Sequence, residues 1–320
     1  MPFVPKKQAF NAHINEVVLG VGDKATAIGG QNVLPFHTFD AEIKNAPKIG
    51  VELTDLGMAE YTMPGEKAFY AGCTTVAEMA KRAETLEGAS FICLHLEGAD
   101  PNGLNKSVEE CVQLAKDVSD ATTLPLVIMG CKNIEKDGEL FSKIAEALQG
   151  KNILVLSARN EDYKTVGASV ALAYGQKVGA ETADDINLAK QLNIMLKGLS
   201  INPENIVMNV GTAAVGYGFE YVASTLDRIR LAALAQSDAD LQMPIMSPPP
   251  LWMRPFKSSA AKQPIPISKN FFTARQLSFW PPPQPAVCSW PQVPRHGPPF
   301  GVGSKKYPET PFPTNTAAAR

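Results

Sequence analysis

Residues that could perform redox or metal chemistry are widely spaced in this sequence of 320 residues. Four of the five cysteines, Cys73, Cys93, Cys111 and Cys131, lie roughly 20 residues apart, and no C-x-x-C pair occurs. Zinc sites and iron–sulfur clusters need thiolates at short, fixed spacing. The cysteines are therefore interpreted as structural thiols, and no metal site is predicted on this chain.

Side chains suited to covalent catalysis are also few. Lys132 comes closest, because it follows a predicted strand by two residues, but a solvated loop lysine is the simpler interpretation. No histidine has an evident carboxylate partner in a nucleophile arrangement. We therefore expect no catalytic residue on this chain.

The elements that must position any site follow from the period of the apolar residues. Between residues 49 and 247, short aliphatic runs alternate with longer segments of helical period, which indicates βα units and a parallel sheet. The predicted strands are Ile49 to Leu53, Phe91 to Leu96, Leu126 to Gly130, Ile153 to Ala158, Lys177 to Glu181, Ile206 to Val210 and Pro244 to Ser247. The length of the repeat and the lack of G-x-G-x-x-G after the first strand favour a closed barrel over a dinucleotide-binding sheet.

Helices and an N-terminal hairpin complete this prediction. We expect helices over residues 108–118, 140–148 and 186–199. Ser107 and Glu110 have the spacing of a capping box before the first of them. Residues 11–40 hold an aliphatic run and several glycines, and we expect a hairpin there that plugs the bottom of the barrel, away from its active face.

Composition changes abruptly near Ser247. Residues 248–320 hold nine Lys or Arg against one acid, Glu309, so this tail is near +8 and residues 1–247 are near −10. The tail also holds all three tryptophans and 17 of the 26 prolines. Its basic residues are scattered among prolines without a recognisable fold, so nucleic-acid binding is not predicted.

Membrane association is not predicted either. No apolar run reaches the roughly 18 residues that a bilayer span needs, and residues 1–10 lack the apolar core of a signal peptide. We therefore expect a cytoplasmic protein.

Loops at the carboxyl ends of the strands are where a parallel barrel carries its chemistry. Here these loops are rich in glycine and poor in catalytic side chains. Asp100 and Asn160 could hydrogen-bond a heterocycle at the barrel mouth, or could be a turn residue and a helix N-cap. The glycine run from Gly211 to Gly218, which includes Tyr217, is predicted to form a ligand or partner surface.

Seven segments, in order, resemble the small subunit of the corrinoid/iron–sulfur protein, which is the same family as the delta subunit of the acetyl-CoA decarbonylase/synthase complex. They are Leu34-Pro-Phe-His-Thr-Phe-Asp, Leu96-Glu-Gly-Ala-Asp-Pro, Met129-Gly-Cys-Lys-Asn-Ile-Glu-Lys-Asp, Gln191-Leu-Asn-Ile, Gly216-Tyr-Gly-Phe-Glu-Tyr, Leu226-Asp-Arg-Ile-Arg-Leu-Ala-Ala-Leu and Met243-Pro-Ile. The resemblance covers about residues 15–247. It implies a TIM-type (β/α)8 barrel, which in this chain lacks its eighth strand.

The function that the resemblance implies is to hold a cofactor rather than to catalyse. A corrinoid (a cobamide) would lie at the interface with a large subunit, which carries the iron–sulfur cluster. It would take a methyl group from methyltetrahydrofolate or a methylated tetrahydropterin, through a methyltransferase, and pass it to acetyl-CoA synthase in the reductive acetyl-CoA (Wood–Ljungdahl) pathway of carbon fixation. The positions expected to bind the corrinoid are Asp100, Gly130, Cys131, Asn160, Thr182, Gly211, Gly216 and Tyr217.

Cobalt ligation by this chain is not expected. Corrinoid-binding modules often supply the lower cobalt ligand from an Asp-x-His-x-x-Gly loop, but His95-Leu-Glu-Gly98 is preceded by Cys93 and lies in a predicted strand. His95 is therefore interpreted as a residue of the barrel wall. The alternative function is a self-sufficient pterin-dependent methyltransferase, a related barrel with Asp and Asn at its strand ends.

These observations divide the chain into three parts. Residues 1–48 form an N-terminal extension with the hairpin, residues 49–247 form an incomplete barrel, and residues 248–320 lie outside the resemblance. A natural proline-rich tail should be polar and poor in tryptophan. Our hypothesis is that a reading-frame shift near codon 248 has replaced the eighth strand by a disordered tail, which would leave the edges of the first and seventh strands unpaired.

Overall fold

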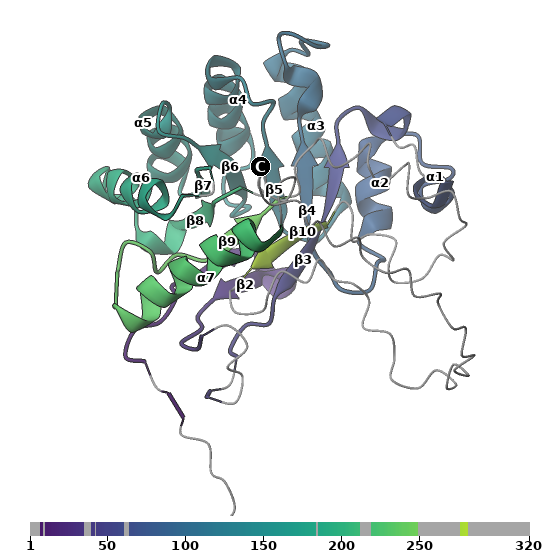
Figure 1. The fold of residues 1–320 in the computed structure, drawn as a ribbon. Helices are drawn as coiled ribbons and strands as arrows, with labels where there is room; N and C mark the ends of the chain where they lie inside the picture. Colours follow the sequence, from purple (N-terminus) through teal and green to yellow (C-terminus); the bar gives the residue numbers. More distant parts are fainter. Residues whose placement is uncertain are drawn as a thin grey trace, which may run out of the picture. The chain divides into compact units, whose positions relative to one another are not determined.

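Seven parallel strands follow one another in chain order around a curled sheet, and helices cover its outer side (Figure 1). The computed structural model describes residues 7–8, 10–34, 40–41, 43–60, 64–183, 185–211, 219–248 and 276–280. The parallel strands are β3 (Lys48–Thr54), β4 (Ala89–His95), β5 (Leu126–Met129), β6 (Leu154–Ala158), β7 (Lys177–Glu181), β8 (Ile206–Asn209) and β9 (Ile245–Ser247). All seven predicted strands are present, so the predicted α/β barrel is confirmed.

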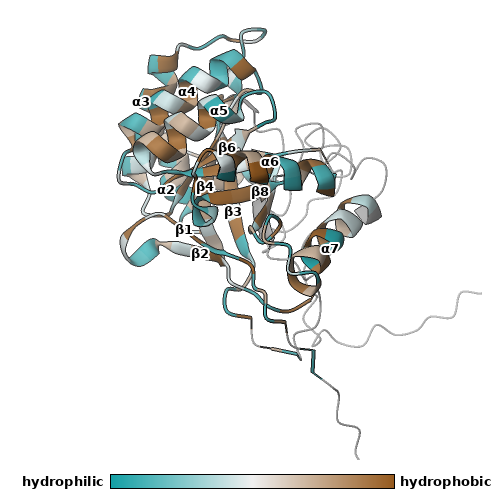
Figure 2. Ribbon diagram, turned by 90° about the vertical axis from the view of Figure 1, so that its left-hand side faces the viewer, coloured by the Kyte–Doolittle hydropathy of each residue, from teal (hydrophilic) through white to brown (hydrophobic). Residues whose placement is uncertain are grey.

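Helices connect these strands on the outside of the barrel. They are α1 (Pro64–Phe69), α2 (Val76–Ala83), α3 (Val108–Ala121), α4 (Ile134–Ala147), α5 (Tyr163–Val166), α6 (Ile186–Gly198) and α7 (Phe219–Ala235). The 3-10 turns are η1 (Gly22–Lys24), η2 (Gly57–Glu60), η3 (Glu97–Ala99) and η5 (Pro203–Asn205), and the π-helical turn η4 (Gly167–Leu172) continues α5. In Figure 2 the barrel strands are largely hydrophobic, whereas α3 and α4 also carry hydrophilic residues, as expected for helices with one buried face.

Local capping fixes where α3 begins. The Ser107 hydroxyl accepts a hydrogen bond from the Glu110 amide at 3.1 Å, and the Glu110 carboxylate accepts one from the Ser107 amide at 2.8 Å. This confirms the predicted capping box, and Thr75 and Glu78 form the same arrangement before α2. The predicted helices over 108–118, 140–148 and 186–199 correspond to α3, the second half of α4 and α6.

An N-terminal hairpin lies at the amino ends of the barrel strands. Its strands, β1 (Glu16–Leu19) and β2 (Thr26–Gly29), pair antiparallel. Asn152, just before β6, donates hydrogen bonds to the carbonyls of Val18 and Gly20 at 2.8 and 3.1 Å. The predicted hairpin is therefore confirmed, and it leaves the carboxyl ends of the strands to form the opposite face of the barrel.

The hairpin contributes to a second apolar core inside the barrel. Its buried members come from the hairpin and from alternate positions of the strands: Val17, Leu19, Ile28, Phe91, Cys93, Val127, Met129, Leu154, Leu156, Val207 and Met246. The apolar residues at the intervening strand positions pack outward against the helices in a larger cluster. Because successive side chains point to opposite sides of a strand, the same strands contribute residues to both cores.

The gap between β9 and β3 is filled in a way that the sequence did not predict. Strand β10 (Gln276–Trp280) pairs antiparallel with both neighbours, with Gln276 opposite Val51 and Trp280 opposite Ile245. The described residues thus form seven parallel barrel strands and no eighth one, as predicted, but the edges of β3 and β9 are paired rather than open. Unpaired edge groups attract any available strand, and an antiparallel one satisfies them as well as a parallel one.

Tight packing at Gly50 provides a test of the barrel interior. A Cβ at this position would collide with the ring of Phe91 on β4, whereas a Cβ at Gly198, the last residue of α6, would meet no atom within 4 Å. We expect Gly50→Ala to lower the free energy of unfolding by about 1–3 kcal/mol through overpacking, and Gly198→Ala to raise it by up to about 1 kcal/mol. Urea denaturation followed by circular dichroism measures both, and equal effects of the two substitutions would contradict this packing.

Candidate functional site

Six of the eight predicted corrinoid-binding positions lie in described loops at the carboxyl ends of the strands. Asp100 follows β4 and η3, Gly130 and Cys131 follow β5, Asn160 follows β6, Thr182 follows β7 and Gly211 follows β8. Carboxyl ends of parallel strands share one edge of the sheet, so the fold places these six on the same face. Gly216 and Tyr217 lie outside the described residues.

Buried polar atoms without a partner mark the β7–β9 side of this face. The hydroxyl oxygens of Thr182, just after β7, and of Ser247, at the end of β9, are buried and have no hydrogen-bond partner among the described residues. The Thr182 amide donates to the carbonyl of Asn209 at 2.9 Å, which ties the loop to β8. This bond fixes the backbone of Thr182, while the hydroxyl groups of Thr182 and Ser247 form no hydrogen bond within the described part of the chain.

Asn209 organises the neighbouring strand ends. Its side-chain amide donates to the Ser157 hydroxyl at 3.1 Å, and its carbonyl oxygen accepts from the Gly211 amide at 3.2 Å. Asn209 and Ser157 are buried, and Gly211 has a φ of +76°, a left-handed conformation that glycine adopts without strain. This side of the mouth is polar and hydrogen-bonded, and Thr182 and Gly211 are neighbours in it.

The loop after β5 is organised by a buried carboxylate. Asp137, on the first turn of α4, accepts hydrogen bonds from the amides of Cys131 and Lys132 at 2.8 and 2.9 Å and from the Cys131 thiol at 3.2 Å. A side chain at Gly130 would collide with this carboxylate. The small size of Gly130 therefore has a packing reason.

Titration of the groups in this loop follows from their burial. Burial raises the pKa of the Asp137 carboxyl, against the opposing effect of the hydrogen bonds that it accepts from Cys131. Burial also raises the pKa of the Cys131 thiol to about 12, and the charge of Asp137 adds to the shift. Cys131 is thus a protonated thiol at neutral pH, which is a poor nucleophile.

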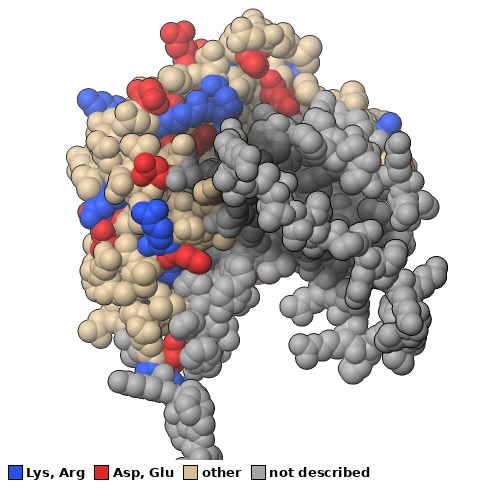
Figure 3. Space-filling model, viewed as in Figure 1, with Lys and Arg blue, Asp and Glu red and all other residues tan. Residues whose placement is uncertain are grey.

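Three charged side chains form an ion-pair cluster at the ends of β5, β6 and β7. Lys132 Nζ lies 2.7 Å from Glu181 Oε1, and Arg159 Nε lies 3.7 Å from the same oxygen. Arg159 also donates to the Lys132 carbonyl at 3.2 Å. Lys132 is therefore held in an ion pair with Glu181. On the side of the molecule that Figure 3 shows, basic and acidic side chains are also intermixed over the coloured part.

A buried histidine lies between two carboxylates where β3 and β4 end. His95 Nδ1 lies 3.2 Å from Glu52 Oε1 and 3.7 Å from Glu97 Oε1. His95 is the last residue of β4, in the barrel wall as expected. The sequence did not reveal a carboxylate partner, because Glu52 is 43 residues away and meets His95 only through the pairing of β3 with β4.

Asp55 ties the end of β3 to the loop after β4. Its carboxylate accepts from the Gly98 amide at 2.9 Å and pairs with Lys106 Nζ at 3.0 Å. In the same loop Asp100 accepts from the Asn102 amide at 2.9 Å, which is the turn geometry considered as its alternative role. Asn160 is exposed, and the N-cap of α5 is Asp162 instead.

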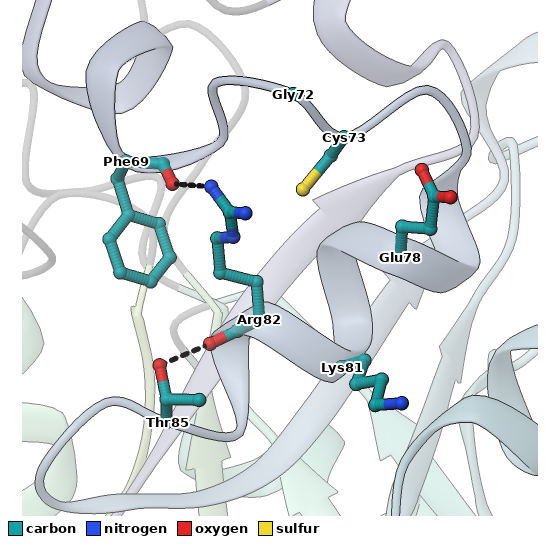
Figure 4. A pocket seen from close by; sticks show the side chains of 7 residues that line it. All are labelled: Phe69, Gly72, Cys73, Glu78, Lys81, Arg82 and Thr85. Carbon is teal, nitrogen blue, oxygen red and sulfur yellow. Dashed lines mark hydrogen bonds between the residues drawn. The ribbon is translucent and has the colours of Figure 1, made fainter.

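A hollow of about 520 Å³ lies against α1 and α2 (Figure 4). Its lining includes Phe69, Cys73 and Arg82 and none of the predicted site residues. Arg82 donates to the carbonyls of Phe69 and Ala71 at 2.8 and 2.7 Å, so its charge holds the turn after α1. Among the described residues, no group of three His, Cys, Asp or Glu side chains could hold a metal ion.

Comparison with known proteins decides the family. Residues 16–256 match the model of the family described as CO dehydrogenase/acetyl-CoA synthase delta subunit. The chain belongs to this family. The match ends close to Ser247, where the resemblance seen in the sequence also ends. Within the described part of the chain, no helix is long and apolar enough to cross a membrane.

Curated relatives agree with the family match. The chain is 34% identical over 255 residues to the acetyl-CoA decarbonylase/synthase complex subunit delta of Archaeoglobus fulgidus, covering 77% of this chain and 56% of that protein. It is 34% identical over 247 residues to the subunit of the same name from Methanothermobacter thermautotrophicus, covering 77% and 62%. With subunit delta 1 of Methanosarcina thermophila the identity is 32% over 232 residues, covering 71% and 52%. The chain therefore spans between half and two thirds of the length of these relatives.

The raised pKa of Cys131 predicts slow alkylation. With a pKa of about 12 instead of 9.0, the folded thiol has on the order of 10³-fold less thiolate at pH 8.5 than the unfolded chain. Because the folded pKa is the higher one, the folded state also loses stability as the pH rises above about 9. Iodoacetamide labelling read by peptide mass spectrometry measures the rate, with the urea-unfolded chain as reference.

Asp137→Asn is the matched variant for this measurement. Removing the carboxylate charge lowers the pKa of Cys131 and should speed its labelling in the folded chain. Labelling of folded wild-type Cys131 at the rate of the unfolded chain would contradict the assigned environment.

Proposed function

We propose that this chain is the small (delta) subunit of a corrinoid/iron–sulfur methyl carrier, and that the carboxyl-end face of its barrel helps to hold the corrinoid. Family membership supports a subunit role in the acetyl-CoA decarbonylase/synthase system. The relatives are longer than the matched part, so the activity and partners of the whole protein belong to the proposal.

The observation that carries the proposal is the pair of buried hydroxyls of Thr182 and Ser247. A buried hydroxyl without a partner costs about 1–3 kcal/mol, so such groups are expected where a ligand satisfies them. A corrinoid ring is rimmed by amide side chains, which offer donors and acceptors to hydroxyls. The hydrogen-bonding groups of this face thus fit a corrinoid. Thr182, Ser247 and the backbone at Gly211 would contact it.

The described side chains of this face are suited to binding a corrinoid and not to reacting with its methyl group. When bound, the corrinoid supplies a cobalt ion that accepts and releases a methyl group. A free thiolate or amine beside it would compete for that methyl group. Cys131 is protonated and bonded to Asp137, and Lys132 is paired with Glu181, so both reactive groups are restrained.

Partners follow from the same proposal. A large subunit would carry the iron–sulfur cluster and share the corrinoid, a methyltransferase would deliver the methyl group from a methylated tetrahydrofolate or tetrahydropterin, and acetyl-CoA synthase would receive it. This is the methyl branch of the reductive acetyl-CoA pathway, in the cytoplasm. In this arrangement the chain is a non-catalytic subunit, and Asp100, Asn160, Gly216 and Tyr217 are further proposed contacts.

The origin of residues 248–320 is part of the proposal as well. The family match ends at residue 256, and the tail holds one acidic residue, Glu309. We propose that a reading-frame shift near codon 248 separates the barrel, residues 49–247, from the tail. Translating the other two frames of that stretch tests this idea, and it fails if neither frame yields an eighth strand.

Co-expression with the corrinoid-bearing large subunit, in medium containing hydroxocobalamin, tests the proposed function. We expect a complex with the absorbance of a bound corrinoid. Thr182→Val should reduce corrinoid retention during gel filtration by about 2- to 10-fold, because it removes a hydroxyl worth about one hydrogen bond. Thr165→Val, at an exposed position of α5, is the matched control and should retain the wild-type amount.

Two results would contradict the proposal. One is a chain that neither binds the large subunit nor changes its corrinoid content. The other is methyl transfer from methyltetrahydrofolate to free cob(I)alamin by this chain alone, which would establish the self-sufficient pterin-dependent methyltransferase instead.

A further inference from the structure

The outward face of α6 carries no charged side chain. The exposed residues of this helix are Asn187, Leu188, Gln191, Ile194 and Gly198, and none of them is ionisable. Leu188 and Ile194 are each 47% exposed. A surface helix usually turns charged and polar side chains to water, so the outward face of α6 departs from the usual pattern.

The other helices on the outside of the barrel keep that pattern. In the described part of the chain, each of them exposes at least one charged side chain. One example from each, in the order α1 to α5 and α7, is Lys67, Glu78, Lys116, Glu139, Lys164 and Arg228. The absence of charge is therefore a property of α6 and not of the helical layer as a whole.

The two lysines of α6 are paired along one flank of the helix. Lys190 Nζ lies 2.6 Å from Asp238 Oδ2, and Lys197 Nζ lies 2.7 Å from Asp240 Oδ1, in the segment that follows α7. At about 100° per residue, both lysines lie to the same side of the exposed residues. The charges of α6 are thus directed toward the α7 side and away from the outward face.

On its other side, α6 packs against the turn η4. A Cβ at Gly167 of η4 would contact the side chains of Leu196 and Leu199, and α5 and α6 are neighbours in Figure 1. The exposed residues of η4 are Ala168 and Leu172, and Leu172 is 50% exposed. The uncharged surface therefore extends from α6 onto η4.

The exposed residues of α6 have the spacing of a helix–helix contact. Asn187, Gln191, Ile194 and Gly198 follow one another at intervals of four, three and four residues. This spacing places them in one narrow stripe along the helix, about 60° wide, as at the seam between two packed helices. Leu188 borders the stripe. The face thus has both the composition and the geometry of an interface core, where charged residues are depleted.

Charge identifies the surface that fits this face. A charged side chain pressed against it would lose water without gaining an ion pair, so the matching surface must be uncharged as well. Among the described residues of the α-helices, α6 alone exposes such a face. Residues 1–247 carry a net charge near −10, so two copies of the barrel repel one another through their charged faces. A second copy therefore meets this face best with the same face.

We propose that the outward face of α6, extended by η4, is the contact surface of a symmetric dimer of this chain. A two-fold axis across the helix sets two copies of α6 antiparallel, and Gln191, near the middle of the helix, then faces its counterpart. A primary amide carries both donors and an acceptor, so two of them pair with each other. The contact covers Leu172, Leu188 and Ile194 of both copies. This inference does not depend on the corrinoid.

Self-association of the full 320-residue chain tests the surface. Sedimentation velocity should show a dimer with a Kd below about 10 µM. Ile194→Glu places like charges in the contact and should raise the Kd at least about 10-fold. Leu231→Glu, on the outward side of α7, is the matched control, because Leu231 is 46% exposed and Ile194 is 47% exposed, and it should leave the Kd unchanged. Equal Kd values for the two variants would overturn the proposal.

A different occupant would give a different result. A wild-type chain that stays monomeric at about 100 µM would overturn the dimer. If Ile194→Glu then also weakened co-purification with the large subunit, the face would belong to that subunit instead. Circular dichroism of each variant checks that the fold is kept, which we expect because both substituted positions are exposed.

Charge exchange at Gln191 tests the two-fold arrangement. Gln191→Glu and Gln191→Lys each place like charges opposite one another, so either variant alone should dimerise at least about 10-fold more weakly than the wild-type chain. An equimolar mixture of the two should recover dimerisation, because the opposite charges then pair. Two variants that dimerise no better when mixed than alone would overturn the proposed contact of Gln191 with its counterpart.

Discussion

The hydrogen-bond ladder from β3 to β9 is the constraint on which the rest of this protein depends. Each parallel strand is placed by its two neighbours, so the loops at the carboxyl ends meet at one face only while the ladder is continuous. The antiparallel strand β10 stands where a barrel of this type has its eighth parallel strand. It pairs the edges of β3 and β9, but the described residues include no helix that follows β9.

Alternation along the ladder divides the interior into two zones with different roles. Near the amino ends, residues such as Phe91, Val127 and Val207 form an apolar core that the hairpin covers. Near the carboxyl ends, the strands present Glu52, His95 and Asn209, which are buried and hydrogen-bonded. The apolar zone stabilises the barrel, and at the polar end the Thr182 hydroxyl is buried without a hydrogen-bond partner among the described residues. The proposed holding role follows from this division.

Periodicity, capping and motif reading from the sequence predicted most of the fold because these signals are local. The strand from Ile49 to Leu53 is observed as Lys48–Thr54, and the Ser107–Glu110 capping box is present. What depends on register or tertiary packing could not be predicted. The pairing of Glu52 with His95 requires knowing how β3 aligns with β4, and the antiparallel pairing of β10 has no sequence signature.

The candidate site shows the same limit. The loops at the strand ends were read as the candidate site, and Thr182 and Gly211 lie in such loops, after β7 and β8. The sequence could not show that Gly130 is small because the Asp137 carboxylate packs against it. Nor could it show that Arg230, within the recognised segment Leu226-Asp-Arg-Ile-Arg, is buried. Burial and hydrogen-bond partners are properties of the assembled barrel, so the buried Nε and Nη1 atoms of Arg230, which have no partner among the described residues, become visible only there.

A structure of the co-purified complex with the large subunit, determined by cryo-electron microscopy, tests the central claim most directly. The account predicts a corrinoid over the carboxyl ends of the strands, with the hydroxyls of Thr182 and Ser247 within hydrogen-bonding distance of its amide side chains. A corrinoid that lies against the hairpin end of the barrel, or that is held by the large subunit without contact to this face, would contradict the account.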